Sequence, residues 1–494
     1  ATTGEFNTSL GSLSMGSGVT TGNSNVAIGY QSGHALTSGS ENITIGQGAG
    51  DALTTGTRNV AVGHAALSTE NEHGKNVAIG YLSLLTLDAG VDGFNVAVGY
   101  GAGALMTTGV ENTLIGGQAG DSLTTGTRNV ALGYQALNSE DAHGNNVAIG
   151  FASLYAQDAG TDAYNTAVGY ASGINVTTGA YNTLIGGLAG DALTTGEMNV
   201  AVGYGSLGSE DGNGKCVAIG MSALTTQNAG AEAYNVAVGY NAGYAVTTGT
   251  HNVIIGGLAG DAMTTAVHNV AIGHNAMTAV TEGNTNIAIG RDALATNTVG
   301  DRNVAIGHEA LMTMNPTGDS DNYNVAVGYN AGKAVTTAVQ NTLIGGLAGD
   351  ALTDGSYNVA IGYAALSAED ANGRNVAIGF NSLTSQNAGA DAYNVAVGFK
   401  AGENVSTGTS NTIIGGLAGD ALTGGSANTA IGKDSLTACV DGDFNTAVGF
   451  EALEDYNEGD GNGHNTAIGS QSQRQVTTGE FNTSLGSLSM GSGV

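Results

Sequence analysis

N-V-A-I-G at residues 25–29 is one copy of a five-residue pattern that returns along the whole chain. Counting from Asn7 to Asn482, the pattern has 28 anchor positions, separated by 17 residues in 20 of the 27 intervals and by 18 to 21 in the others. Asn occupies every anchor position except 216, where Cys216 replaces it. Such a fixed period is the signature of a repeat protein built from stacked, equivalent units.

Each position of the pattern has a physical reason. The residue after the anchor is always Val, Ile or Thr, and the third residue after it is always Ile, Val or Leu. This alternation around a small residue predicts a short strand in which Val26 and Ile28 face one way and Ala27 faces the other. Gly29 then ends the strand, where a corner needs positive φ or contact without a Cβ.

The anchor Asn25 is expected to stack its amide on the Asn of the neighbouring rungs, as in cross-β ladders. The same structural roles are assigned to later copies of the pattern, represented by Asn129, Gly133, Asn358 and Gly362.

The predicted fold is therefore all-β: a parallel β-solenoid, or β-roll, of about 28 rungs with a 17-residue repeat. Residues 1–494 are expected to form one continuous solenoid, in which each rung has one strong and one weaker strand. At about 4.8 Å per rung, the coil would be roughly 130 Å long. Its repeating strip of alanines is expected to be buried by association, which predicts a homotrimer.

Composition narrows the possible partners. The formal net charge is -30, from 41 acidic and 11 basic residues. This argues against nucleic acid and anionic membranes, since phosphate groups are bound by clustered Lys and Arg. No apolar run approaches the ~20 residues that a membrane helix needs, so membrane insertion is not expected. Two cysteines, Cys216 and Cys439, are too few for a disulfide framework.

The two ends carry the same eighteen residues, TTGEFNTSLGSLSMGSGV, at positions 2–19 and 477–494. The offset of 475 predicts one period of a longer array plus an 18-residue overlap. End-to-end continuation of the solenoid is therefore expected, because an open solenoid end exposes an unpaired strand edge.

Three rungs carry a family resemblance: N-V-A-I-G-Y-Q-S-G at 25–33, N-V-A-L-G-Y-Q-A-L at 129–137 and N-V-A-I-G-Y-A-A-L at 358–366. They resemble the repeats of tail-fibre-like proteins and of the head domains of trimeric autotransporter adhesins. The resemblance implies a trimeric, left-handed parallel β-roll on a cell or virion surface that takes part in attachment.

One acidic column could bind calcium through carboxylate and backbone oxygens. Its members lie four or five rungs apart, so no two could share an ion, and a role in accepting local backbone N–H groups is favoured. No other metal or cofactor is predicted. The column comprises Asp51, Asp121, Asp191, Asp261, Asp350 and Asp420.

Other polar and aromatic positions are assigned to the surface. The acidic loops around Glu140 and residues 158–162 are expected to be solvated. His251 and His268 are expected to stack on adjacent rungs at the surface, with a metal-binding pair as the alternative. The aromatic residues that end the longer rungs are expected to cover bulges, with glycan stacking as the alternative. These are Phe94, Tyr164, Tyr234, Tyr323 and Tyr393.

The function expected from the sequence is that of a shaft or spacer in a long extracellular surface fibre with an adhesive role. A bacteriophage tail-fibre shaft for host attachment is one alternative, and an ice- or calcium-binding solenoid is another. A receptor tip, if present, would lie outside this segment. No local cluster of acids and bases interrupts the repeat, so an enzyme is not expected. Replacing Ile149 by Asp is expected to bury an unpaired charge and open only nearby rungs.

Overall fold

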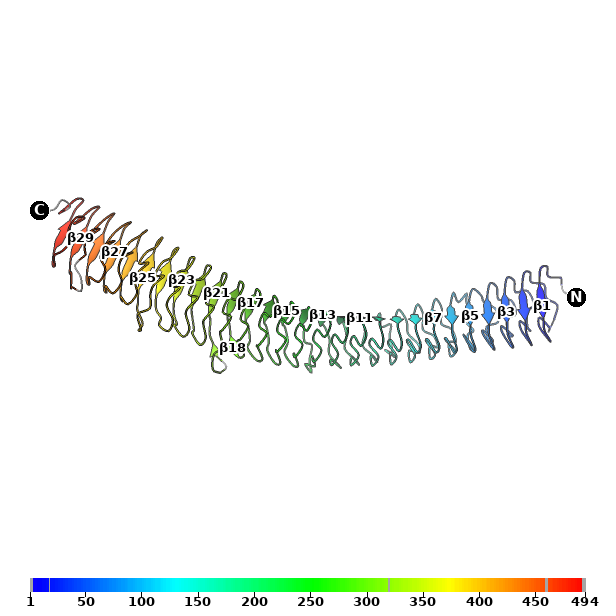
Figure 1. The fold of residues 1–494 in the computed structure, drawn as a ribbon. Coiled ribbons are helices and arrows are strands. Elements are labelled where there is room, and N and C mark those ends of the chain that lie inside the picture. The colour runs from blue at the N-terminus through cyan, green and yellow to red at the C-terminus, as the bar shows by residue number, and fades with distance from the viewer. Residues whose placement is uncertain (1–2, 17, 319, 458–460, 491–494) are drawn as a thin grey trace. The chain divides into compact units, whose positions relative to one another are not determined.

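A computed structural model describes residues 3–16, 18–318, 320–457 and 461–490. The chain divides into two compact units, Ala1–Thr250 and His251–Val494. Each unit is a parallel β-solenoid, and together they hold about 28 rungs with a repeat of about 17 residues (Figure 1). The described residues contain strands and turns but no helix, so none could cross a membrane as an apolar helix. The predicted fold class is confirmed.

The strands of the first unit are β1 (Thr8–Leu10), β2 (Val26–Ile28), β3 (Ile43–Ile45), β4 (Val60–Val62), β5 (Val77–Ile79), β6 (Val96–Val98), β7 (Thr113–Ile115), β8 (Val130–Leu132), β9 (Val147–Ile149), β10 (Thr166–Val168), β11 (Thr183–Ile185), β12 (Val200–Val202), β13 (Val217–Ile219) and β14 (Val236–Val238).

The strands of the second unit are β15 (Val253–Ile255), β16 (Val270–Ile272), β17 (Ile287–Ile289), β18 (Gly300–Asp301), β19 (Val304–Ile306), β20 (Ser320–Asp321), β21 (Val325–Val327), β22 (Thr342–Ile344), β23 (Val359–Ile361), β24 (Val376–Ile378), β25 (Val395–Val397), β26 (Thr412–Ile414), β27 (Thr429–Ile431), β28 (Thr446–Val448), β29 (Thr466–Ile468) and β30 (Thr483–Leu485). Of these, β18 and β20 form a separate two-stranded sheet.

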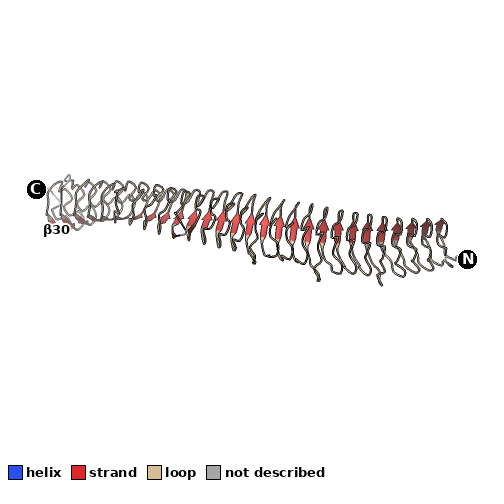
Figure 2. Cartoon of the chain, turned by 90° about the horizontal axis from the view of Figure 1, so that it is seen from below, coloured by secondary structure: helices blue, strands red, loops and turns tan. Residues whose placement is uncertain are grey.

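Within each unit, the three-residue strands stack side by side in parallel and in register (Figure 2). In the first unit, Val26 pairs with Ile43, Ala27 with Thr44, and Ile28 with Ile45. Each strand begins directly after an anchor residue, as the sequence pattern predicts. Every rung therefore presents the same backbone positions at the same place along its unit.

Among the described rungs, the predicted second, weaker strand forms only as the two-residue pair β18 and β20. In the other described rungs it does not form. Its place is taken by successive turns in which left-handed residues interrupt the extended backbone, such as Gln31 with φ 57° and Gly33 with φ 53°. The turns still connect neighbouring rungs, because Gln31 N–H donates to Ser12 O (3.1 Å) and Gly33 N–H donates to Ala49 O (2.9 Å). The expectation of two strands in every rung was therefore wrong for the described rungs other than those of β18 and β20, although hydrogen bonds link the rungs on both sides.

The core lies between the strands and these turns. Ala27, at the centre of β2, is fully buried, and Leu36 of the turn side is 1% exposed, while Val26 and Ile28 are half-buried on the outer side. The alanine column thus faces the interior of its own coil. It is not a strip left for another chain to bury, so the reasoning that led from it to a homotrimer was wrong.

Ile149 belongs to the outer side of β9 and is half-buried, whereas its neighbour Ala148 is fully buried. A charge at position 149 would therefore not enter the core, which corrects the expectation for Ile149→Asp.

Candidate interaction surface

The anchor asparagines form a buried hydrogen-bonded ladder. Asn25 is fully buried; its Nδ2 donates to Gly39 O (2.8 Å), and its Oδ1 accepts from the backbone N–H of Asn42 (3.0 Å). Asn129 and Asn358 make the same backbone bond to the Asn of the preceding rung, at 2.9 and 2.8 Å. Each side-chain amide forms hydrogen bonds with groups on neighbouring rungs. The ladder therefore fixes the distance between rungs, and with it the spacing of the side chains on the outer surface.

The outer side of the strands is an aliphatic face. Two β-branched or aliphatic side chains per rung point away from the core, and members such as Leu132, Ile185 and Ile219 are about two-fifths exposed. The alternation that buries the central residue of each strand therefore leaves the first and third residues outside, and the third is always Ile, Val or Leu. We call this the outer aliphatic face; each unit repeats it on every strand of its main sheet.

Aromatic rings stack along the column that follows the corner glycine. In the first unit, Tyr81 and Tyr100 stack with ring centroids 5.4 Å apart. Neighbouring rings in these aromatic ladders are between 5.1 and 5.8 Å apart, and most are about half exposed. The ladders comprise His64–Tyr81–Tyr100, Tyr134–Phe151–Tyr170, His308–Tyr329 and Tyr363–Phe380–Phe399.

A second glycine interrupts the aromatic column at regular intervals. Gly117 stands between Tyr100 and Tyr134, and a Cβ at this position would lie 3.3 Å from Tyr134 Cδ2. Gly187 and Gly346 meet the next tyrosine in the same way. The ring next to the glycine is more exposed than the ring inside the ladder. Tyr100, the last ring before Gly117, is 60% exposed, whereas Tyr81, inside the same ladder, is 47% exposed. The apolar surface is therefore divided into short aromatic ladders.

The aromatic residues that end the longer rungs lie beside charged side chains, a feature that sequence reasoning missed. Lys75 Nζ lies 4.8 Å from the ring centroid of Phe94 and forms an ion pair with Asp92 (2.6 Å). Lys215, Arg302 and Arg374 contact Tyr234, Tyr323 and Tyr393 in the same way, and Tyr164 stacks on Tyr181 instead. The rings remain about half exposed, with their polar partners repeated along the coil.

The six aspartates of the predicted calcium column stay separate from one another. None of them belongs to a group of three potential metal ligands within the described residues. Partial burial raises the pKa of the Asp51 carboxyl, while the backbone N–H groups of Asp51 and Ala52 lower it. Burial raises the pKa of Asp121, Asp191, Asp350 and Asp420 as well, and Asp261 Oδ1 accepts from Thr278 Oγ1 (2.5 Å).

One acidic loop differs from its predicted solvation. Glu140, expected at a solvated face, is fully buried, and burial raises its pKa to about 7. The predicted stacking of two histidines on adjacent rungs is confirmed, because the ring centroids of His251 and His268 lie 5.0 Å apart.

Both cysteines are buried and neither forms a disulfide bond. Burial raises the pKa of the Cys216 thiol to about 12 and that of Cys439 to about 11. At neutral pH both side chains are therefore thiols rather than nucleophilic thiolates.

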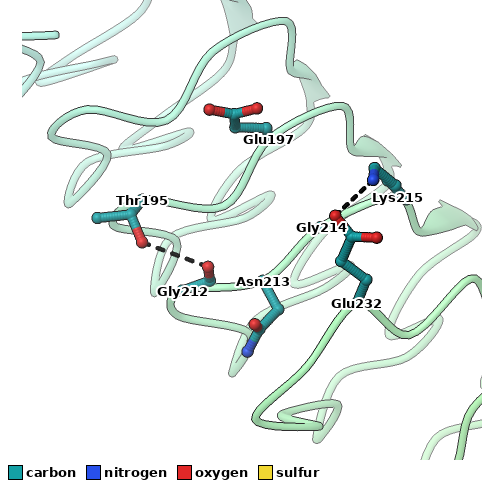
Figure 3. Close-up of a pocket in the computed structure, with 7 residues that line it drawn as sticks. All are labelled: Thr195, Glu197, Gly212, Asn213, Gly214, Lys215 and Glu232. Carbon is teal, nitrogen blue, oxygen red and sulfur yellow. Dashed lines mark hydrogen bonds and ion pairs between the residues drawn. The ribbon is translucent and has the colours of Figure 1, made fainter.

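A shallow surface pocket of about 240 Å³ lies among loops of the first unit (Figure 3). Thr195 Oγ1 donates to Gly212 O (3.3 Å) across it, and Lys215 forms an ion pair with Glu232. The pocket is thus a polar space between successive rungs. Its lining residues are Thr195, Glu197, Gly212, Asn213, Gly214, Lys215 and Glu232.

No protein-family model and no curated protein matches the sequence.

Proposed function

We propose that this chain is a structural shaft of an extracellular fibre, and that its outer aliphatic face and aromatic ladders bind further copies of the chain. The observation that carries the proposal is the regular exposure of large apolar side chains on strand after strand of each unit. Contiguous apolar surface of this kind marks interaction sites in soluble proteins.

The repetition favours a second copy as the partner. A solenoid whose rungs present apolar residues of the same kind at the same positions offers similar binding groups at each step, so an identical chain can match it along its length. The adhesin and tail-fibre resemblance supports a trimer among the possible assemblies, and supports a place on a cell or virion surface.

A shaft also needs cohesion along its length, and the rungs supply it. The buried asparagine ladder and the strand pairing connect each rung to the next within each unit. Such nearest-neighbour contacts give a rigid spacer without a large core. The acidic surface, with a formal charge of -30, keeps associated chains soluble in a saline exterior.

Electron microscopy of the purified chain tests the proposal. The expected particles are filaments whose cross-section contains several solenoid coils side by side. Single coils at micromolar concentration would contradict the association, and would leave the outer apolar surface to a different partner.

A further inference from the structure

Two clusters in the first unit bring together carboxylate and imidazole groups. One consists of Glu140, Asp141 and His143, and in it one potential ligand atom from each residue lies within 4.8 Å of the others. The second consists of Glu70, His73 and Asp88, with the same spacing. We call them the Glu140 cluster and the Glu70 cluster.

The Glu140 cluster contains two buried atoms without a partner. Glu140 Oε1 accepts from the backbone N–H of His143 (3.1 Å), while Oε2 is buried and has no hydrogen bond. His143 Nδ1 is also without one, and lies 3.7 Å from Glu140 Oε1. A fully buried carboxylate with a free oxygen is costly, and a bound cation removes that cost.

The Glu70 cluster lies one super-repeat earlier and differs in one contact, because Glu70 Oε2 accepts from the backbone N–H of Ala89 (3.3 Å). Glu70 is fully buried and its Oε1 accepts from the backbone N–H of His73 (3.1 Å). His73 Nδ1 has no hydrogen bond and lies 3.8 Å from Glu70 Oε1. Asp88 comes from the following rung, where its backbone N–H donates to Thr107 O (2.8 Å). The ligand atoms are thus held by two successive rungs.

The carboxylates of these two clusters are not neutralised by lysine or arginine side chains of the described residues. Within the described part of the chain, no Lys or Arg forms an ion pair with Glu70, Asp88, Glu140 or Asp141. A third cluster, in the second unit, differs in this respect: Arg291 pairs with Asp292 (2.9 Å) and Lys333 with Glu309 (2.5 Å), beside His308. That cluster is already compensated, whereas the first two are not.

The repeat itself supplies a comparison. At the positions equivalent to His73 and His143, two later super-repeats have Asn213 and Asn372. The position of Asp88, occupied by Asp158 in the second copy, also becomes Asn in these repeats, at Asn228 and Asn387. The position of Asp141 is different, since both later repeats keep an aspartate there, at Asp211 and Asp370, so relative to the Glu140 cluster they lack only the histidine.

The buried glutamate and its backbone bond remain in the later repeats. Asn213 N–H donates to Glu210 Oε1 (3.2 Å), and Asn372 N–H donates to Glu369 Oε1 (3.2 Å). Glu210 Oε2 and Glu369 Oε2 are buried without a hydrogen bond, as Glu140 Oε2 is, so the histidine and not the free carboxylate oxygen distinguishes the two earlier clusters from these repeats.

We propose that the Glu70 and Glu140 clusters each bind one Zn²⁺ ion. Neutral imidazole and carboxylate oxygen are ligands that suit zinc, at about 2.0–2.2 Å, whereas calcium prefers an all-oxygen set. Three protein ligands per cluster leave a coordination position for water. The ions stabilise the loops in which the ligands lie, and the asparagine-bearing repeats do without them.

Isothermal titration calorimetry with Zn²⁺ on the full chain, purified without a histidine tag, tests the proposal. The native chain is expected to bind one ion at each cluster. His73→Asn and His143→Asn should each remove one binding equivalent, and the double variant should remove both. Since Asn occupies the equivalent position in two other repeats of this chain, the variants are expected to fold, which circular dichroism checks.

A reciprocal variant makes the test stricter. Asn213→His combined with Asn228→Asp recreates the ligand set of the Glu70 cluster around Glu210, and should add one equivalent of bound Zn²⁺. The proposal is overturned if the native chain binds no Zn²⁺, or if the double His variant binds as much Zn²⁺ as the native chain.

Discussion

The corner glycine after each strand meets two requirements at once. Gly133 has φ 143°, and a Cβ there would lie 2.2 Å from Gly150 O on the next rung. Gly160 also has positive φ, 68°, but a Cβ there would meet nothing within 4 Å. Comparing alanine substitutions at Gly133 and Gly160 therefore separates two free-energy costs: that of a left-handed backbone and that of a steric clash between rungs.

Gly133→Ala should therefore lower the free energy of unfolding far more than Gly160→Ala. We expect about 1 kcal/mol for Gly160→Ala, the usual cost of a left-handed non-glycine residue, and more than about 3 kcal/mol for Gly133→Ala, where the clash adds to it. Denaturant unfolding of the two variants measures the difference. Equal losses would show that the rungs can separate to admit a methyl group.

The buried glutamates predict a pH dependence that the surface acids do not. Burial raises the pKa of Glu369 from 4.5 to about 7, although the Asn372 N–H lowers it and the Asp370 charge raises it further. Because the folded-state pKa lies above the unfolded value, the native state holds the proton more tightly. Stability is then full below about pH 4.5 and falls as the pH rises towards 7.

Glu369→Gln should remove this contribution. The loss between pH 5 and pH 8 in the native chain includes roughly 2–3 kcal/mol from this carboxyl, and the variant should show a correspondingly smaller loss. Urea unfolding at both pH values measures it. An unchanged pH dependence in Glu369→Gln would show that water reaches the carboxylate.

At the scale of single residues, the structural roles that could be predicted from the sequence are those of positions that accept only one residue type. Gly29 and Asn25 belong to this group, since the corner and the ladder accept little else. It could not predict the left-handed residue before each anchor, such as Arg58 or Tyr181, both with φ 59°, because any residue type stands there. Nor could it predict the burial of Glu140, since a loop rich in acids has the composition of a solvated surface.

Within each strand, the alternation of side chains defined two faces but not which one is inside. The turn side packs against the central residue of each strand, which is a small residue such as Ala148 in most rungs and a buried Leu or Ile such as Leu114 in others, while Ile149 stays outside. A small residue suggests close packing against any neighbour. Sequence reasoning assigned that neighbour to another chain, and the structure assigns it to the same chain.

Ala148→Asp should consequently disrupt the strand more than Ile149→Asp. We expect a local loss of roughly 3–5 kcal/mol for the buried, unpaired charge at 148, and about 1 kcal/mol for the half-exposed site at 149. Hydrogen exchange should show the opening confined to rungs near β9, since solenoid stability comes from neighbouring rungs. Global unfolding by Ala148→Asp would contradict this local account.

On the scale of the whole molecule, repetition turns a minor exposure into a large apolar surface. One half-buried Ile on a strand is ordinary, but an Ile, Val or Leu at this position on every strand of a unit's main sheet, beside stacked rings, is a surface that a second chain can cover. The fold could be predicted from sequence because 28 copies carry the same signal. The association surface could not, because it depends on which face of a three-residue strand is inside.

The absolute molar mass of the native particle in solution, by light scattering, tests the association most directly. We expect a multiple of 48.5 kDa, with three chains favoured. Lys at the outward positions Leu132, Ile149 and Ile185 should lower the mass to that of one chain, whereas Lys at the exposed loop positions Thr161, Ala231 and Ala390 adds the same charge and should leave it unchanged. A native particle of 48.5 kDa would contradict the account.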